Sequence, residues 1–356
     1  MKELDYIVVG LGIAGLTFCE QLIKNKKTFI VFDTGKYTST LVSAGVINPV
    51  VLKRFTPVWN AKEHIHSSIK FYNHLSEKLE VSLLKGIPML RIFKSIEEQN
   101  NWMVASDKNE LSEFLHSKIV KNDNQYINAP YGFGKVKSTG RINPIQLIQI
   151  YKEYLLKSNQ FRNEKFEYEN LKKENNQIQY KDIIANKIVF SEGYSAKDNP
   201  YFPQNIKEGN EQLIIKNKGE YVLIKAPDLK LDAMLKTSLF IIPLGNDIYK
   251  VGATYDREDD SIKTTKNAKT EMVSKLTKII NCPFEIVDQV AGIRPTTRDR
   301  RPFLGTLNNS EQIVFFNGLG TRGITSAPSL AELLYNHIEN GVTLPKEVDI
   351  KRHYNW

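Results

Sequence analysis

The apolar residues at the start of the chain form two short runs separated by a helical repeat. Residues 6–9 and 28–32 are almost entirely apolar, without the alternation of a half-exposed strand. Between the runs, apolar residues recur at the spacing of a helix, at Ile13, Leu16, Cys19, Leu22 and Ile23. The pattern predicts two parallel strands joined by a helix, in a sheet that is covered on both faces.

Similar patterns predict the rest of the secondary structure. Helical spacing recurs over 61–79, after the Asn143-Pro144 pair and over 266–280. Strand-like runs occur at 88–93, over 166–190 as a three-stranded meander with its first turn at 173–176, and at 221–224, 239–242 and 249–253. The last helix is expected to begin near Pro328, capped by Thr325 or Ser326, and to stop at Gly341.

Length and composition favour a two-domain globular enzyme. The chain has 356 residues, of which 41% are hydrophobic and 25% charged. No apolar run approaches the roughly 20 residues of a membrane span, so we expect no membrane association. Cys19 and Cys282 form no CxxC pattern, which argues against a disulfide framework and against a metal site. The N-terminus has no apolar signal core, and we therefore expect a cytoplasmic protein.

The formal net charge of +9 is consistent with two kinds of surface. A basic balance attracts nucleic acid or phosphate-bearing substrates, but lysine-rich surface segments also produce it, and we favour that explanation here. The exception is a group of arginines that adjoins a candidate functional motif, namely Arg294, Arg298, Arg300 and Arg301.

A glycine fingerprint joins the first strand to the first helix. Gly10, Gly12 and Gly15 have the GxGxxG spacing of a dinucleotide-binding turn, in the strand–helix context that this motif requires. The first glycine permits the tight turn, and the second lets the backbone, with Ile13 and Ala14, approach a pyrophosphate. The third lets the helix pack closely on the strand. The fingerprint alone does not separate a flavin from a nicotinamide.

Other positions extend the predicted dinucleotide site. Asp33 and Thr34 follow the second strand, where a carboxylate would accept hydrogen bonds from ribose hydroxyls. A nicotinamide dehydrogenase would continue with repeated strand–helix units, whereas this chain inserts other segments before Gly193, which is a further candidate for cofactor binding. That insertion favours a flavoprotein with an interleaved substrate domain. Gly320 and Gly323 would allow the C-terminal backbone to approach the same ligand.

Taken together, these motifs resemble the D-amino-acid oxidase superfamily of FAD enzymes, which includes glycine oxidase and sarcosine oxidase. The resemblance extends over nearly the whole chain and includes the fingerprint, 43–46, 140–144, 251–254, 292–295, Asp299-x-x-Pro302 and the last glycine block. Residues 320–328 and 44–49 are similar to one branch in particular. That branch is the FAD oxidase domain of the bifunctional enzyme that modifies the aminomethyl side chain of the tRNA wobble uridine.

The resemblance implies an α/β fold with two interleaved domains. A Rossmann-like FAD-binding domain of the glutathione-reductase type would comprise residues 1–80, 140–205 and 290–356. A substrate domain built on a mixed or antiparallel β-sheet would comprise residues 81–139 and 206–289.

The resemblance also implies how the cofactor is held. FAD would bind non-covalently, because no cysteine lies in the segment that tethers the flavin in sarcosine oxidases. The backbone around Leu171 would meet the adenine. The flavin would be lined near its reactive N5 by Ser43, Ala44, Gly45 and Val46, and its pyrimidine end would be held by Gly320, Arg322, Gly323, Ile324 and Thr325.

Arg294 is the residue that, by the same resemblance, would fix a substrate carboxylate, because its guanidinium offers a two-point fork. Arg322 is a second candidate, on the substrate or on the flavin rim. Lys53 and Arg54 follow the flavin loop and are candidates for the mouth of the site. Phe240 stands where small-amino-acid oxidases often carry a tyrosine, so one hydrogen bond to a carboxylate would be missing.

The activity implied is oxidation of the C–N bond of an amino acid or N-substituted glycine, by hydride transfer to flavin N5. The partner would then be a small amine or amino acid. Two other functions remain open. One is a tRNA-modifying FAD oxidase that removes a carboxymethyl group from a wobble uridine side chain, with tRNA as the partner. The other is a flavin-binding protein without turnover.

Overall fold

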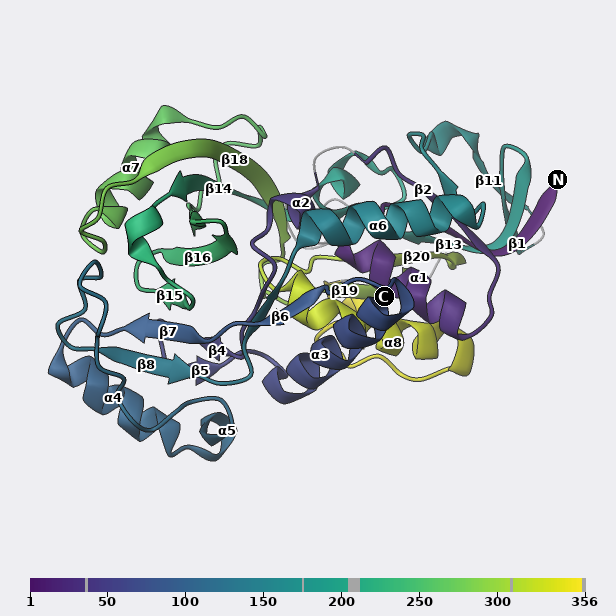
Figure 1. Ribbon diagram of the computed structural model, residues 1–356. Coiled ribbons are helices and arrows are strands. Elements are labelled where there is room, and N and C mark those ends of the chain that lie inside the picture. Colours follow the sequence, from purple (N-terminus) through teal and green to yellow (C-terminus); the bar gives the residue numbers. More distant parts are fainter. Residues whose placement is uncertain (36–37, 175, 204–211, 308–309, 354–356) are drawn as a thin grey trace.

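Two large β-sheets form the two ends of the molecule, and helices pack against both (Figure 1). The computed structural model describes residues 1–35, 38–174, 176–203, 212–307 and 310–353. One sheet has eight strands, which include the first and the last strand of the chain, and the other sheet has seven. Within the described residues, no helix is both long and apolar enough to cross a membrane.

The eight-stranded sheet combines five parallel strands, one of which lies at an edge, with three antiparallel strands. Its parallel strands are β1 (Lys2–Val9), β2 (Phe29–Phe32), β10 (Phe161–Arg162), β13 (Ile183–Phe190) and β20 (Ser310–Asn317). Its antiparallel strands are β11 (Leu171–Glu174), β12 (Gln177–Tyr180) and β19 (Phe303–Leu307). The predicted strand–helix–strand unit is confirmed, with α1 (Ile13–Lys24) between β1 and β2. The predicted meander is β11 to β13, although its first strand begins at Leu171 rather than at 166.

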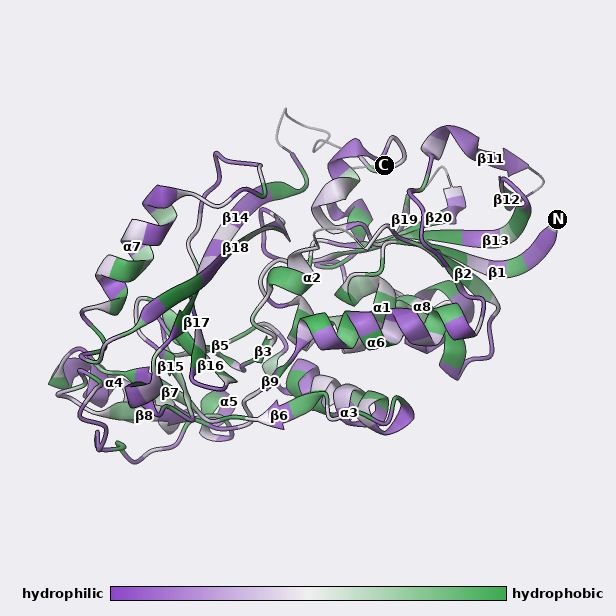
Figure 2. Ribbon diagram, turned by 45° about the horizontal axis from the view of Figure 1, so that its top comes forward, coloured by the Kyte–Doolittle hydropathy of each residue, from purple (hydrophilic) through white to green (hydrophobic). Residues whose placement is uncertain are grey.

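Four long helices gather on one face of this sheet (Figure 2). They are α1, α3 (Ala61–Lys78), α6 (Pro144–Lys157) and α8 (Gly323–Asn340). The Asn143 side chain caps α6 by accepting from the Gln146 N–H at 3.3 Å, and Pro144 fills the first turn as predicted. The other face buries a second core cluster with stacked aromatic rings such as Phe166 and Tyr180, whose centroids lie 4.1 Å apart.

The seven-stranded sheet draws its strands from two separate parts of the chain. Its order is β18 (Glu285–Thr296), β14 (Ile215–Lys225), β17 (Ile248–Gly252), β16 (Phe240–Gly245), β15 (Met234–Lys236), β7 (Met89–Ile92) and β8 (Phe133–Val136). Only β15 and β7 pair in parallel. Helix α7 (Lys266–Leu276) packs on this sheet, whereas α4 (Ile96–Ser106) and α5 (Asn109–Ser112) belong to a separate core cluster at the same end of the molecule.

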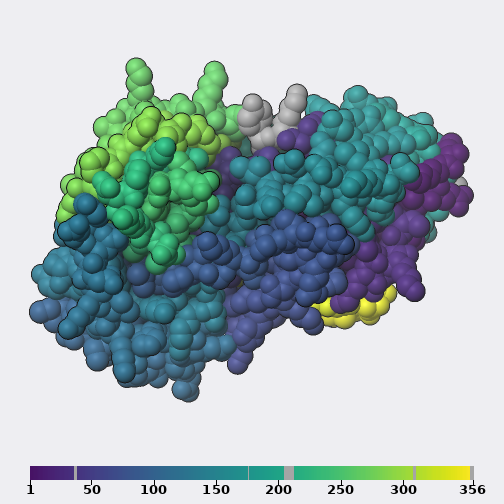
Figure 3. Space-filling model, in the orientation of Figure 1, coloured from purple at the N-terminus to yellow at the C-terminus, as the bar shows by residue number. Residues whose placement is uncertain are grey.

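Figure 3 shows these two parts of the chain, in blue and green, side by side at one end. We therefore keep the predicted division into a cofactor domain and a substrate domain as a proposal, with β18 running across its boundary. Short strands join the two ends: β3 (Val46–Ile47), β6 (Leu84–Gly86) and β9 (Gly140–Ile142) form one sheet, and β4 (Val50–Val51) pairs with β5 (Thr56–Pro57).

The last helix begins earlier than the sequence pattern predicts. Helix α8 starts at Gly323, so Thr325 and Ser326 lie in its first turn and Pro328 lies inside the helix. Its N-cap is Arg322, whose side chain makes no capping hydrogen bond. The predicted start near Pro328 is therefore wrong. A proline inside a helix removes one N–H donor, and here a side chain from another helix replaces it.

That side chain is Tyr72 of α3. Pro328 cannot donate to the carbonyl four residues earlier, which belongs to Ile324. The Tyr72 hydroxyl donates to this carbonyl oxygen at 2.8 Å, and the Tyr72 side chain is fully buried. The bond satisfies the carbonyl that the proline leaves open, and it fixes the beginning of α8 against α3.

We expect Tyr72→Phe to destabilise the protein, because it leaves the buried Ile324 carbonyl without a donor. The expected loss of unfolding free energy is about 1–3 kcal/mol, which would lower the thermal midpoint by a few degrees. Tyr131→Phe is the control, since Tyr131 is partly exposed and its hydroxyl bonds no described residue. Equal midpoints for the wild type and Tyr72→Phe would contradict this role.

Candidate active site

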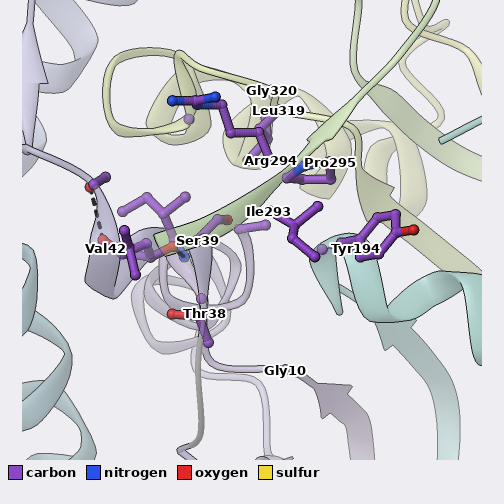
Figure 4. Close-up of a pocket in the computed structure, with 18 of the residues that line it drawn as sticks. Gly10, Thr38, Ser39, Val42, Tyr194, Ile293, Arg294, Pro295, Leu319 and Gly320 are labelled. Atoms are coloured by element: carbon purple, nitrogen blue, oxygen red, sulfur yellow. Dashed lines mark hydrogen bonds between the residues drawn. The ribbon is translucent and has the colours of Figure 1, made fainter. Parts of the chain in front are cut away.

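A cavity of about 810 Å³ is lined by residues of both sheets. Figure 4 shows how segments far apart in the sequence meet there: the turn at Gly10, the α2 segment (Ser39–Val42), strand β18 near Arg294 and the loop at Gly320. Most of the residues that the sequence singles out line this cavity. They are Gly10, Gly12, Ile13, Ala14, Asp33, Thr34, Ser43, Ala44, Gly45, Val46, Gly193, Arg294, Gly320, Arg322, Gly323, Ile324 and Thr325.

The glycine turn requires residues without side chains. Gly10 has a positive φ of 96°, and a Cβ at this position would lie 2.7 Å from the Ser191 carbonyl oxygen. A Cβ at Gly15 would lie 1.9 Å from the Gly10 carbonyl oxygen. Gly15 does not line the cavity, and its place between helix and strand matches the packing role expected for the third glycine. Gly12 is the N-cap of α1, so the helix begins at the cavity wall.

The Asp33 carboxylate lies at the end of β2, beside the glycine turn. Its Oδ2 accepts from the Leu11 N–H at 2.5 Å, and its Oδ1 accepts from the Gly35 N–H. These bonds fix the carboxylate at the cavity wall, and an ionised carboxylate still has lone pairs for further donors. Thr40 also shapes this wall, because its hydroxyl accepts from the Ile13 N–H at 3.0 Å. The sequence analysis missed Thr40, whose contact to the turn spans 27 positions.

The segment 42–45 lines the cavity, and donors behind it bind its carbonyl oxygens. Lys250 of β17 donates to the carbonyls of Val42 at 2.6 Å and Ser43 at 3.2 Å. Arg141 of β9 donates through Nε to the Ala44 carbonyl at 3.1 Å. Burial lowers the pKa of Lys250 to about 8, with repulsion from Arg141 as a smaller cause. Lys250 was missed, although a lysine inside the apolar run 249–253 was the available signal.

The beginning of α8 closes another wall. The Gly320 N–H donates to the Pro295 carbonyl at 3.0 Å, which attaches this loop to β18. Arg322 lines the cavity and donates through Nη1 to the Asn48 carbonyl at 3.0 Å. Burial lowers the pKa of the Arg322 guanidinium to about 10. The free N–H groups and the dipole of a helix N-terminus favour a negatively charged group at this place.

Arg294 extends from β18 along the cavity wall. Its guanidinium lies over Gly219, where an added Cβ would come within 1.9 Å of Nη2, and 4.8 Å from the ring centroid of Tyr255. Its contacts to protein oxygens are long, at 3.4–3.5 Å, and go to Asn217 and to the Thr254 carbonyl. Among the described residues, no carboxylate lies within ion-pair distance of it. Arg294 is therefore held in position without a neutralising partner.

Several sequence-predicted residues lie outside the cavity. Leu171 is buried in the core where β11 begins, opposite Tyr180, so the structure does not bring it to the cavity; Phe166, five positions earlier, lines the wall instead. Lys53 and Arg54 lie in the exposed turn between β4 and β5. The other members of the arginine group do not line the cavity, and these are Arg298, Arg300 and Arg301.

Glu192 is a cavity residue that the sequence analysis did not single out as a candidate. Its carboxylate accepts from the Tyr168 hydroxyl and, at 2.7 Å, from the Asn199 side-chain amide. Burial raises the pKa of Glu192 to about 7. The signal available in the sequence was an acidic residue two positions after the buried strand 188–190. Phe240, which replaces the tyrosine of small-amino-acid oxidases, lines the cavity as well.

Neither cysteine takes part in this site. Cys19 and Cys282 are both free, buried thiols, and neither lines the cavity. Within the described residues, no group of three or more His, Cys, Asp or Glu side chains is arranged to hold a metal ion.

Known proteins share this architecture. The chain is 23% identical to glycine oxidase of Bacillus subtilis over 95% of its own length and 94% of that protein. It is also 23% identical to the tRNA 5-methylaminomethyl-2-thiouridine biosynthesis bifunctional protein MnmC of Campylobacter jejuni subsp. doylei, over 86% of the chain. That alignment covers 46% of the MnmC protein, so the chain spans about half the length of this relative. The alignment with the MnmC protein of Idiomarina loihiensis covers 26% of that protein's length.

A solved structure has the same fold. Iminodiacetate oxidase from Chelativorans sp. BNC1 superimposes with a TM-score of 0.77 at 16% identity, over 96% of this chain and 98% of that one. The model of the family described as "DAO: FAD dependent oxidoreductase" matches residues 5–336. The match includes the glycine turn, the cavity walls and most of α8. The chain belongs to this family of FAD-dependent oxidoreductases.

Proposed function

We propose that this enzyme oxidises the C–N bond of an amine that carries a carboxylate, such as an amino acid or an N-substituted glycine. The observation that carries the proposal is the placement of Arg294. A guanidinium that lines the cavity without a described carboxylate partner is suited to a carboxylate ligand. Glycine oxidase and iminodiacetate oxidase, to which the chain is similar, have carboxylated amines in their names.

The residues that line the cavity fit FAD. We propose that the glycine turn and the N-terminus of α1 hold the pyrophosphate, and that Asp33 accepts hydrogen bonds from the ribose. Residues 43–46 and the beginning of α8 would flank the flavin ring from two sides. Binding would be non-covalent, since both cysteines are buried away from the cavity. The cradle at Gly10, which a single Cβ would fill, supports this assignment.

The proposed reaction requires mainly orientation from the protein. The bound flavin supplies the hydride acceptor: the α-C–H bond breaks as the C=N bond forms, and water then hydrolyses the imine to a carbonyl product and the amine. Arg294 would hold the carboxylate and so place the α-carbon. The aromatic residues Tyr221 and Phe240 line the substrate side of the cavity and would exclude water from it.

A second candidate substrate is the carboxymethylaminomethyl side chain of a modified tRNA uridine. The similarity to the MnmC proteins favours it, and so does the exposure of Tyr255, whose ring is 71% exposed at the cavity. A ring in that position could stack on a base, and the same Arg294 would bind the carboxylate of the side chain. tRNA is a proposed partner in this case only.

Anaerobic bleaching of the flavin by a panel of amines separates these candidates. We expect reduction by glycine, sarcosine or iminodiacetate if the substrate is small, with release of glyoxylate. Reduction by a carboxymethylaminomethyl nucleoside or by tRNA alone would remove the small-amine proposal in favour of the second candidate. No reduction by any carboxylated amine would overturn both.

We expect Arg294→Lys to lower kcat/KM for a carboxylated amine by roughly 10²–10³-fold, because the two-point contact to the carboxylate is lost. The flavin spectrum should be unchanged, since Arg294 is assigned to the substrate. Arg301→Lys is the matched control, because Arg301 stacks on Trp59 outside the cavity. An unchanged kcat/KM in Arg294→Lys would show that the anchor is assigned wrongly.

Gly10→Ala should abolish or severely weaken FAD retention, because the added methyl group would meet the Ser191 carbonyl and the positive φ would be strained. Gly86→Ala is the control, since no atom lies within 4 Å of a Cβ at that position. FAD content after gel filtration measures both variants. Acid precipitation of the wild type should release all of the flavin; flavin that stays with the precipitate would contradict non-covalent binding.

A further inference from the structure

Lys250 extends from the seven-stranded sheet (the substrate sheet) to the loop 42–45 (the flavin loop), and it lies behind this part of the cavity wall. It lies on β17, is only 7% exposed, and its ammonium lies 4.8 Å from the ring centroid of Tyr221. Both of its hydrogen bonds to the protein cross to the α2 segment, where they bind the carbonyls of Val42 and Ser43. A buried amine is costly unless its donors are used, so these two bonds determine where the side chain lies.

The two bonds belong to a continuous set behind the loop 42–45. The Ala44 carbonyl accepts from Arg141 Nε at 3.1 Å, and the Gly45 carbonyl accepts from the Ile142 N–H at 2.9 Å. Four successive carbonyl groups are thus bound to donors outside the loop. Since a trans peptide points its C=O and N–H in opposite directions, these donors fix the orientation of each peptide plane. A carbonyl released from its donor could rotate toward the ligand.

The substrate sheet also touches this loop through packing. A Cβ at Gly292 of β18 would lie 3.0 Å from the Val42 Cβ, so the strand backbone and the loop are in close contact. Lys250 therefore acts on a loop that β18 already supports. Lys250 itself does not line the cavity, and any effect on the ligand must pass through Val42 and Ser43, which do.

We propose that Lys250 is a positioning residue that ties the substrate sheet to the flavin loop and holds residues 42–45 in the conformation that binds FAD. This inference rests on the proposal that residues 43–46 contact the flavin. The protonated amine is the effective form, because a charged donor binds carbonyl oxygens about twice as strongly as a neutral one. It also places a positive charge behind a loop that faces a dianionic cofactor.

The charge on Lys250 is sensitive to mildly alkaline pH. Burial is the main cause that lowers its pKa to about 8; Arg141 on β9 contributes to this lowering and Asp288 on β18 opposes it, while Tyr221 on β14 faces the ammonium. Because the pKa in the folded protein is below the ordinary value of 10.5, folding opposes the charge, and this lysine's contribution to stability rises between pH 8 and 10.5. A loss of FAD affinity in that range would therefore not come from unfolding linked to Lys250.

The test measures the FAD dissociation constant of the apo-protein by quenching of flavin fluorescence. At pH 7 we expect Lys250→Met to weaken FAD binding by roughly tenfold or more, because its charge-assisted hydrogen bonds are lost. Lys250→Arg should retain most of the affinity. Lys236→Met is the matched control. The pKa of Lys236 is also lowered by burial to about 8, but its amine lies over the Phe240 ring, away from the loop.

The pH series provides a second readout. Wild-type affinity should fall between pH 7 and 9.5, while Lys250→Met should show a weak affinity that does not change across that range. Equal affinities of wild type and Lys250→Met at pH 7, or a pH dependence that persists in the variant, would overturn the proposal. If Lys250→Met does not fold, the wild-type series decides, and a flat profile is then the contrary result. Failure of the amine panel would leave these FAD measurements unaffected, so the two proposals fail independently.

Discussion

The cavity depends on the close approach of two backbones at the end of the parallel sheet. Ser191, directly after β13, donates through its N–H to the Val9 carbonyl at 2.8 Å, and through its hydroxyl to the carbonyls of Val9 and Gly10, both at 2.9 Å. These contacts leave no room for a Cβ at Gly10 or Gly15. The turn after β1 and the end of β13 therefore meet at one point, and the N-terminus of α1 is directed at the ligand from there. A bulkier turn would separate the strands that carry the rest of the site.

The second constraint is the length of β18. This strand pairs with β14 as far as Thr296, so Arg294 and Pro295 lie at the end of the seven-stranded sheet that reaches the loop at Gly320. The Pro295 carbonyl then fixes Gly320, and Gly320 leads into α8. One strand thereby sets the distance between the proposed substrate anchor and the proposed flavin-binding helix end. Because both are attached to the same strand, a shift of the substrate sheet would move them together rather than apart.

The sequence predicts the parts of this molecule that are encoded locally. The GxGxxG turn, Asp33 and the meander are patterns whose geometry follows from glycine, chain direction and hydrophobic spacing. The assignment of Arg294 came from the family resemblance instead. The errors and omissions involve partners distant in the sequence. Pro328 was expected to mark a helix start because it has no N–H to donate inside a helix. The Tyr72 hydroxyl on α3 replaces this missing donor, so the helix extends to both sides of the proline. Leu171 was assigned to the adenine through the family resemblance, and it lies in the core opposite Tyr180 on β12. Lys250 bonds a loop about two hundred positions away, which no local pattern contains.

Negatively and positively charged side chains lie on different parts of the cavity wall, and this separation determines how a dinucleotide can be oriented. The lining carboxylates Asp33, Glu164 and Glu192 lie just after β2, β10 and β13, and Lys165 follows Glu164. The lining guanidiniums Arg294 and Arg322 lie at β18 and α8. Carboxylates accept from neutral donors such as ribose hydroxyls but repel anions, and guanidiniums favour carboxylates and a negatively charged reduced ring. A dinucleotide inserted in the opposite sense would set its electron-rich end against carboxylates and its sugar hydroxyls against guanidiniums, which cannot accept hydrogen bonds. The charge separation that orients the cofactor therefore also favours an anionic substrate at the end of the cavity that holds the two arginines.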